Sequence, residues 1–161
     1  MREHIFLPLG MHDTVADENE KIVEHRTRFY TRAKEGELQN GPYVDNSYKW
    51  AGGGFLSTGE DLVRFGSAHL RGGHLKPATL ALLFTSQRTK AGEETGYGIG
   101  WFIGRKGVKY RVIGHGGGSI GGTSQLALFP DSNVVVAVLT NLTEAPLKFE
   151  DVQRIAEPFM K

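Results

Sequence analysis

The feature that most constrains the fold is a glycine-rich stretch at residues 114–122, where six of nine residues are glycine. Each glycine loses backbone entropy on folding and offers no side chain to a core, so a packed strand or helix disfavours such a run. Apolar, β-branched segments flank the stretch at residues 110–113, 126–129 and 134–139. The pattern predicts that a strand ends at the glycines and that the chain turns back there. His115 then lies beside bare backbone, which leaves room for a ligand.

Hydrophobic spacing predicts both helices and strands, with the last helix facing an antiparallel sheet. Short links between successive strands are typical of an antiparallel meander. Strands are expected at residues 97–103, 110–115, 123–129 and 133–141, joined by residues 104–109, the glycine-rich stretch and residues 130–133. Residues 16–49 show no lasting period and predict a long surface excursion, with one or two short strands within residues 22–33.

Helices are expected at residues 2–7, 59–70, 77–84 and 147–160. Ser57 or Thr58 is predicted to cap the second of these helices, because a hydroxyl there can accept from a free backbone N–H of the first turn. The last helix is predicted to face the sheet with four apolar residues: Phe149, Val152, Ile155 and Phe159. The first helix shows no start signal, so residue 1 is predicted to lie within a helix that begins earlier.

Composition excludes several classes of function. The chain has 161 residues, which fits one domain on a prior of about 100–200 residues per domain. Lysine and arginine number 19 and the acids 18, so the net charge of +1 provides no broad field for nucleic acid or a membrane surface. The longest apolar run, residues 134–139, is too short to span a bilayer. Cysteine is absent and the six histidines show no metal-ligand spacing, so neither a metal nor another cofactor is predicted.

Several short motifs overlap in the glycine-rich stretch. Residues 117–121 fit the G-x-S-x-G nucleophile elbow and residues 115–118 fit the oxyanion motif of some esterases. An elbow needs a following helix, whereas β-prone residues follow Gly122, and the two motifs belong on separate loops. A phosphate-binding loop would need a Lys-Ser or Lys-Thr pair that is missing. Spacing alone therefore favours a strand-end histidine at position 115 that bonds nearby carbonyls.

Five blocks taken together carry a more specific signal. In order along the chain they resemble the C-terminal half of the serine β-lactamase-like family, which holds class C β-lactamases, penicillin-binding DD-peptidases and related esterases. The blocks are residues 5–14, 51–62, 97–101, 114–118 and 139–141. The resemblance covers nearly the whole chain. It implies an α/β architecture of the α+β type, in which an antiparallel sheet carries helices on its faces. This is a partial β-lactamase/transpeptidase-like fold, with an active site beside an edge strand.

The resemblance also implies roles for particular residues. The segment His115-Gly116-Gly117 matches the family's third motif, written K-T-G in many members and H-x-G in others. In those enzymes this strand lies along the substrate, its basic side chain helps proton transfer or contacts a carboxylate, and a strand N–H contributes to the oxyanion hole. The implied site therefore has His115 as a catalytic residue and five substrate-binding residues: Gly116, Gly117, Gly118, Ser119 and Asn141. Residues 50–56 either line one wall or form only a helix-entry loop, and Asn141 either lies at the pocket rim or caps a strand end.

The family's nucleophile lies in S-x-x-K and its proton-handling tyrosine in Y-x-N or Y-x-S, and neither motif occurs here. Residues 1–161 are therefore expected to be the C-terminal portion of a single domain, inactive alone, with the N-terminal half as partner. The whole would hydrolyse an amide or ester by acyl transfer, on a small-molecule or peptide substrate such as a β-lactam, a D-Ala-D-Ala-type peptide or a carboxylic ester. Two alternatives stay open: a non-catalytic ligand-binding or interaction module, and an inactive truncated homologue that forms a homodimer through uncovered surface.

Overall fold

Four strands form an antiparallel sheet in which neighbours along the chain also pair in space. The computed structural model describes residues 1–104 and 109–160, and its main sheet has the order β5-β6-β7-β8. The strands are β5 (Phe102–Ile103), β6 (Ile113–Ser119), β7 (Gly122–Phe129) and β8 (Val134–Thr140). The predicted meander and the mixed helix and strand fold class are confirmed. Residues 105–108 of the predicted link lie outside the described residues.

The glycine-rich stretch is part of a strand, so the prediction that the strand ends at His115 is wrong. β6 continues to Ser119 and pairs with β7 at every position, with His115 opposite Leu126. The turn has two residues and is closed by Gly121, whose φ of 94° favours glycine. Glycine keeps both backbone hydrogen-bonding groups, so it can join a ladder. A Cβ at Gly114 would lie 2.5 Å from the carbonyl oxygen of Leu126, which explains why a side chain is excluded there.

The predicted strand at residues 97–103 is reduced to β5. The Gly98 N–H donates to the carbonyl of Trp101 over 2.7 Å, and Gly100 has a φ of 75°. Residues 97–101 therefore form a turn, and Tyr97 is bridged back to Phe102. A side chain is excluded at Gly98, because a Cβ there would lie only 2.0 Å from the carbonyl oxygen of Leu83.

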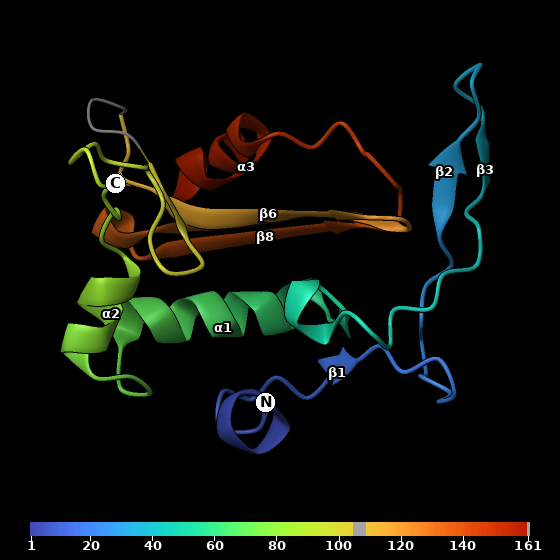
Figure 1. The fold of residues 1–161 in the computed structure, drawn as a ribbon, viewed down its shortest axis with the longest axis horizontal. Coiled ribbons are helices and arrows are strands. Elements are labelled where there is room, and N and C mark those ends of the chain that lie inside the picture. The colour runs from blue at the N-terminus through green and yellow to red at the C-terminus, as the bar shows by residue number, and fades with distance from the viewer. Residues whose placement is uncertain (105–108, 161) are drawn as a thin grey trace.

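Helices cover the two faces of the sheet, with α1 on one side and α3 on the other (Figure 1). The helices are α1 (Gly59–Arg71), α2 (Pro77–Leu83) and α3 (Phe149–Ala156). Thr58 caps α1 by accepting from the Asp61 N–H at 3.2 Å, as predicted. At the N-terminus, the expected helix is a π-helical turn, Arg2–Phe6.

The predicted face of the last helix is wrong in part. Val152 and Ala156 are buried, whereas Ile155 is 48% exposed and Phe159 is 71% exposed. A spacing of four residues places Val152 and Ala156 on one face, and Ile155 turns away from it. The helix ends at Ala156 and continues as a 3₁₀ turn, Glu157–Phe159, so Phe159 leaves the helical face.

Two small strand pairs build the excursion before α1. They are β1 (Val15–Ala16) with β4 (Phe55–Leu56), and β2 (Tyr30–Arg32) with β3 (Leu38–Asn40); a 3₁₀ turn, Trp50–Gly52, precedes β4. β2 falls within the predicted segment, but the other three strands were not predicted. The β2–β3 hairpin stands beyond the turn end of the main sheet (Figure 1).

The core lies on both faces of the sheet at one end. Between the sheet and α3 it contains Val112, Ala127, Phe129, Val152 and Ala156. On the α1 face it is built around Trp101, Ile113 and Leu128. None of these residues reaches the turn between β6 and β7. The glycine end of the sheet is therefore left without a packed helix on its α1 face, and this is where a cavity forms.

Candidate functional site

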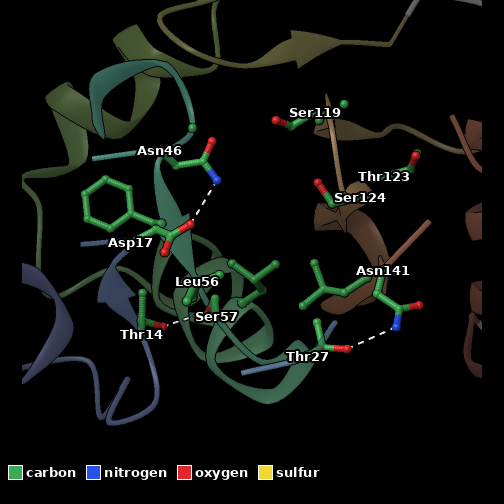
Figure 2. A pocket seen from close by; sticks show the side chains of 18 of the residues that line it. Thr14, Asp17, Thr27, Asn46, Leu56, Ser57, Ser119, Thr123, Ser124 and Asn141 are labelled. Atoms are coloured by element: carbon green, nitrogen blue, oxygen red, sulfur yellow. Dashed lines mark hydrogen bonds between the residues drawn. The ribbon is translucent and has the colours of Figure 1, made fainter. Parts of the chain in front are cut away.

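An open groove of about 700 Å³ lies between the glycine end of the sheet and the loops that precede α1. Figure 2 shows the two walls: Ser119, Thr123 and Ser124 stand on the sheet side, and Asp17 and Asn46 stand opposite them. Much of the remaining lining is apolar, including Phe6, Met11, Phe55, Leu62 and Leu139. The groove thus combines a polar end with an apolar floor, as ligand sites commonly do.

The edge of β6 that borders this region is unpaired over most of its length. β5 pairs with β6 only opposite Ile113 and Gly114, and beyond that point no strand in the described part of the chain covers the edge. The Gly104 N–H donates to the carbonyl of Val112 at 2.9 Å. In β6 and the residue before it, even-numbered residues therefore direct their backbone groups toward β5, and odd-numbered residues direct theirs toward β7. The same alternation directs the N–H groups of Gly116 and Gly118 to the open edge, where they can bind a carbonyl or oxyanion.

His115 stands on this open edge but does not line the groove. Its side chain borders a smaller hollow of about 330 Å³, together with Tyr97, Phe102, Gly116 and Gln125. Both ring nitrogens are engaged: Nε2 lies 2.6 Å from the Tyr97 hydroxyl and Nδ1 lies 2.5 Å from the Gly116 carbonyl oxygen. The second contact is of the kind expected for a strand-end histidine.

The six residues expected at the site therefore fall into two groups. Gly117, Gly118, Ser119 and Asn141 line the larger groove, and His115 and Gly116 line the smaller hollow. The open β6 edge runs between them. The structure places the whole set on neighbouring parts of one strand and one strand end.

Asn141 binds a loop as well as lining the groove. Its Nδ2 donates to the Thr27 hydroxyl at 3.0 Å and to the backbone carbonyl of Arg28 at 3.2 Å, and the backbone carbonyl of Asn141 accepts from the Tyr30 N–H at 2.9 Å. Figure 2 shows the Asn141–Thr27 bond at the rim. Asn141 thus ties residues 27–30 to the end of β8, which combines the two expectations for this residue.

Lys49 is a site residue that sequence reasoning missed. Its ammonium donates to the Ser119 hydroxyl at 2.8 Å, across the groove from one wall to the other. The two residues are 70 positions apart, so no short motif links them. The pair brings a serine and a lysine within hydrogen-bond distance, although on a strand end and a loop rather than on one helix.

A buried polar cluster on the far wall was also missed. Asp17 is 2% exposed; its carboxylate accepts from the Asn46 amide at 2.9 Å and forms an ion pair with Arg26 at 2.8 Å. The Asn46 Oδ1 atom is buried and has no hydrogen-bond partner within residues 1–104 and 109–160. A buried acceptor without a donor is costly, so it marks a place where another group can bind.

Neither a metal-binding cluster nor a membrane-spanning helix is present in the described residues. They contain no cluster of three or more histidine, cysteine or acidic side chains that could hold a metal ion. They also contain no helix long and apolar enough to cross a membrane.

Solved structures show which fold this is. A D-stereospecific amidohydrolase from Streptomyces sp. superimposes with a TM-score of 0.77 at 23% identity, over 97% of this chain and 46% of its own. A D-amino acid amidase from Ochrobactrum anthropi SV3, solved with L-phenylalanine amide, gives a TM-score of 0.74 at 25% identity, over 98% of this chain and 48% of its own. The fold is β-lactamase/transpeptidase-like.

The sequence comparisons then identify the family. The model of the Beta-lactamase family matches residues 1–158, and the chain belongs to this family. The mouse (Mus musculus) serine beta-lactamase-like protein LACTB, mitochondrial, is 38% identical over 80% of this chain and 28% of its own length. Penicillin-binding protein 4 of Amycolatopsis lactamdurans is 33% identical over 96% of this chain and 44% of its own length. The chain thus spans less than half the length of each of these relatives.

Proposed function

We propose that this chain is the C-terminal portion of a serine hydrolase that acts by acyl transfer on an amide or ester. The observation that carries the proposal is the open, glycine-lined edge of β6, with the N–H groups of Gly116 and Gly118 directed outward beside a groove. Membership of the Beta-lactamase family supports a hydrolytic role in general. The D-amino acid amidase that superimposes at 25% identity supports amides as one substrate class.

In this proposal, the nucleophilic serine comes from the other portion of the domain. Its oxygen attacks the substrate carbonyl, the leaving amine or alcohol departs with a proton, and water then cleaves the acyl ester. The Gly118 N–H stabilises the oxyanion that forms in both steps. His115 contacts the substrate or transfers a proton. Glycine is required along the edge because side chains there would keep the substrate away from the backbone.

The groove provides a surface for the other portion to pack against. It is apolar over much of its lining, and the buried Asn46 Oδ1 on its wall lacks a donor in the described chain. A segment with apolar side chains and one hydrogen-bond donor would pack against the apolar floor of the groove and satisfy that acceptor. We expect such a segment in the portion of the relatives that the chain does not span.

Turnover of nitrocefin and of p-nitrophenyl esters tests the proposal. We expect no hydrolysis by the 161-residue chain alone, and hydrolysis once a portion carrying S-x-x-K and Y-x-N is added or fused. Turnover by the chain alone would contradict the claim that it lacks the nucleophile, and the Ser119→Ala variant would then show whether the Lys49–Ser119 pair supplies one.

The same assay tests the role of His115 in the active preparation, which is the chain combined with the portion that carries S-x-x-K and Y-x-N. We expect His115→Ala to lower kcat/KM by about 10²-fold with little change in stability, because the side chain is exposed. His12→Ala, another exposed histidine, is the matched control. An unchanged rate for His115→Ala would remove this residue from the site.

A second candidate function is a non-catalytic ligand-binding module. It is favoured by the Tyr97 and Gly116 contacts, which occupy both ring nitrogens of His115. In that case, a stable amide analogue would bind along β6, Gly117→Val would abolish the binding, and no added portion would produce turnover.

A further inference from the structure

The imidazole of His115 is held in a defined chemical state. Nδ1 lies 2.5 Å from the Gly116 carbonyl oxygen, and a carbonyl can only accept a hydrogen bond. Nδ1 must therefore carry the proton. In the neutral ring, Nε2 is then the acceptor, and the Tyr97 hydroxyl at 2.6 Å is the donor. The two contacts together select the tautomer with the proton on Nδ1.

Tyr97 is itself fixed by its surroundings. Its carbonyl accepts from the Gln87 N–H at 2.8 Å and from the Thr95 hydroxyl at 3.1 Å, and its own N–H donates to the Thr95 hydroxyl at 3.2 Å. It is bridged to Phe102, which pairs with Gly114, the residue before His115. Sheet pairing therefore sets the distance between the backbones of Tyr97 and His115, and their rings meet edge to face at 5.8 Å.

We propose that Tyr97 is a positioning residue that fixes the orientation and tautomer of His115. The proposal rests on the function assigned to His115 above, and adds a residue that no sequence motif assigned to the site. Nε2 is the basic nitrogen in this tautomer. Its hydrogen bond with the Tyr97 hydroxyl orients the ring so that Nε2 faces the smaller hollow. A substrate group can bond to Nε2 by displacing the Tyr97 hydroxyl. Alternatively, it can bond to the hydroxyl, which then links it to Nε2.

Ring nitrogen NMR on the 161-residue chain tests the tautomer without needing turnover. Two-bond ¹H–¹⁵N correlation spectra distinguish the two neutral tautomers, and the His115→Gln variant identifies the signals of His115. At about pH 8.5, where histidine is mostly neutral, we expect the form with the proton on Nδ1 to dominate. Tyr97→Phe removes one hydroxyl and should shift the ring toward the other tautomer. Tyr43→Phe, at a 74% exposed tyrosine, should leave the spectrum unchanged.

A matching test of positioning uses the active preparation. Tyr97→Phe should lower kcat/KM by about tenfold, mostly through kcat, because a misplaced catalytic group slows the reaction. A His115 spectrum that is the same in Tyr97→Phe and in the unmodified chain would overturn the proposal. So would an unchanged rate for Tyr97→Phe in a preparation where His115→Ala shows its expected loss of about 10²-fold.

The test separates this inference from the proposed function. If the tautomer changes in Tyr97→Phe but His115→Ala keeps full activity, the contact between Tyr97 and His115 is established and the catalytic assignment of His115 fails.

Discussion

At the scale of single residues, the ion pair between Arg26 and Asp17 involves a carboxylate on the far wall of the groove. The Asp17 carboxylate is almost fully buried, and Arg26 provides its opposite charge from a side chain that is 26% exposed. Removing one member of a buried pair leaves an uncompensated charge in a region of low polarity. This pair holds the far wall of the groove in place, so stability and site geometry depend on the same contact.

We expect Arg26→Ala to lower the free energy of unfolding by about 3 kcal/mol, measured by urea denaturation. The control is Arg154→Ala, which removes the exposed ion pair with Asp151 and should change stability very little. Equal losses in the two variants would show that the Asp17 pair is no more important than a surface one.

His69 makes stability depend on pH. Burial among Phe65, His74 and Trp101 lowers the pKa of His69, the Phe65 carbonyl opposes the shift, and the nearby charge of His74 adds to it. The folded state then holds its proton less tightly than the unfolded state, whose histidine pKa is about 6.5. Stability is therefore complete above that pH and falls as the pH falls below it.

Unfolding free energies measured between about pH 8 and pH 5 should show this decline. We expect His69→Gln to reduce the slope and His25→Gln, at an exposed histidine, to leave it unchanged. A slope that is the same in all three proteins would exclude His69 as its source.

At the scale of elements, the glycines of β6 differ in what surrounds them. A Cβ at Gly114 would lie 2.5 Å from the Leu126 carbonyl oxygen and 3.1 Å from the Phe149 ring, whereas a Cβ at Gly118 would meet no atom within 4 Å. Gly114 is thus required for packing. Gly118 is free of that constraint, and its lack of a side chain leaves the open edge of β6 accessible.

Gly114→Ala should destabilise the chain by about 1–3 kcal/mol, because backbone atoms must move to admit the methyl group. Gly118→Ala should stay within about 0.5 kcal/mol of the unmodified chain. Thermal unfolding of the two variants checks both values, and a comparable loss in both would mean that β6 is uniformly intolerant of side chains.

The elements that could be predicted from sequence are those with a local signal. β7, β8 and α1 follow from β-branched runs, helical spacing and the cap at Thr58, and the meander follows from short links. β6 could not be bounded, because glycine contributes no pattern while its backbone still pairs. The contacts of Lys49 with Ser119 and of Asn46 with Asp17 join residues 70 and 29 positions apart, so they appear only in the fold. The glycine-lined strand and part of the opposite wall could be proposed from sequence, since four members of the predicted segment 50–56 line the groove: Gly52, Gly53, Phe55 and Leu56. The polar contacts of that wall could not.

At the scale of the whole molecule, the groove is an exposed apolar surface. Leu139 is 40% exposed at its edge, and less than half of the length of each compared relative is represented by this chain. Surfaces of this kind bind other molecules or associate with one another. The homodimer considered from the sequence would use the same surface.

The fluorescence of the dye anilinonaphthalene sulfonate should therefore be stronger in the presence of the folded chain than in buffer alone. Leu139→Glu should reduce that fluorescence because it places a charge in the groove, whereas Leu38→Glu, on β3 and 63% exposed, should not. Equal effects of the two substitutions, or no fluorescence increase with the unmodified chain, would contradict an accessible apolar groove.

The hydrogen bond between Asn141 and Thr27 also constrains when this part of the chain can fold during synthesis. The two residues are 114 positions apart, and synthesis at about 5–20 residues per second separates their emergence by roughly 6 to 23 s. During that interval the segment around Thr27 has no strand end to bind. This part of the groove wall can therefore form only after the end of β8 has been made, and slow translation would lengthen the time for which the segment is open to proteases and chaperones.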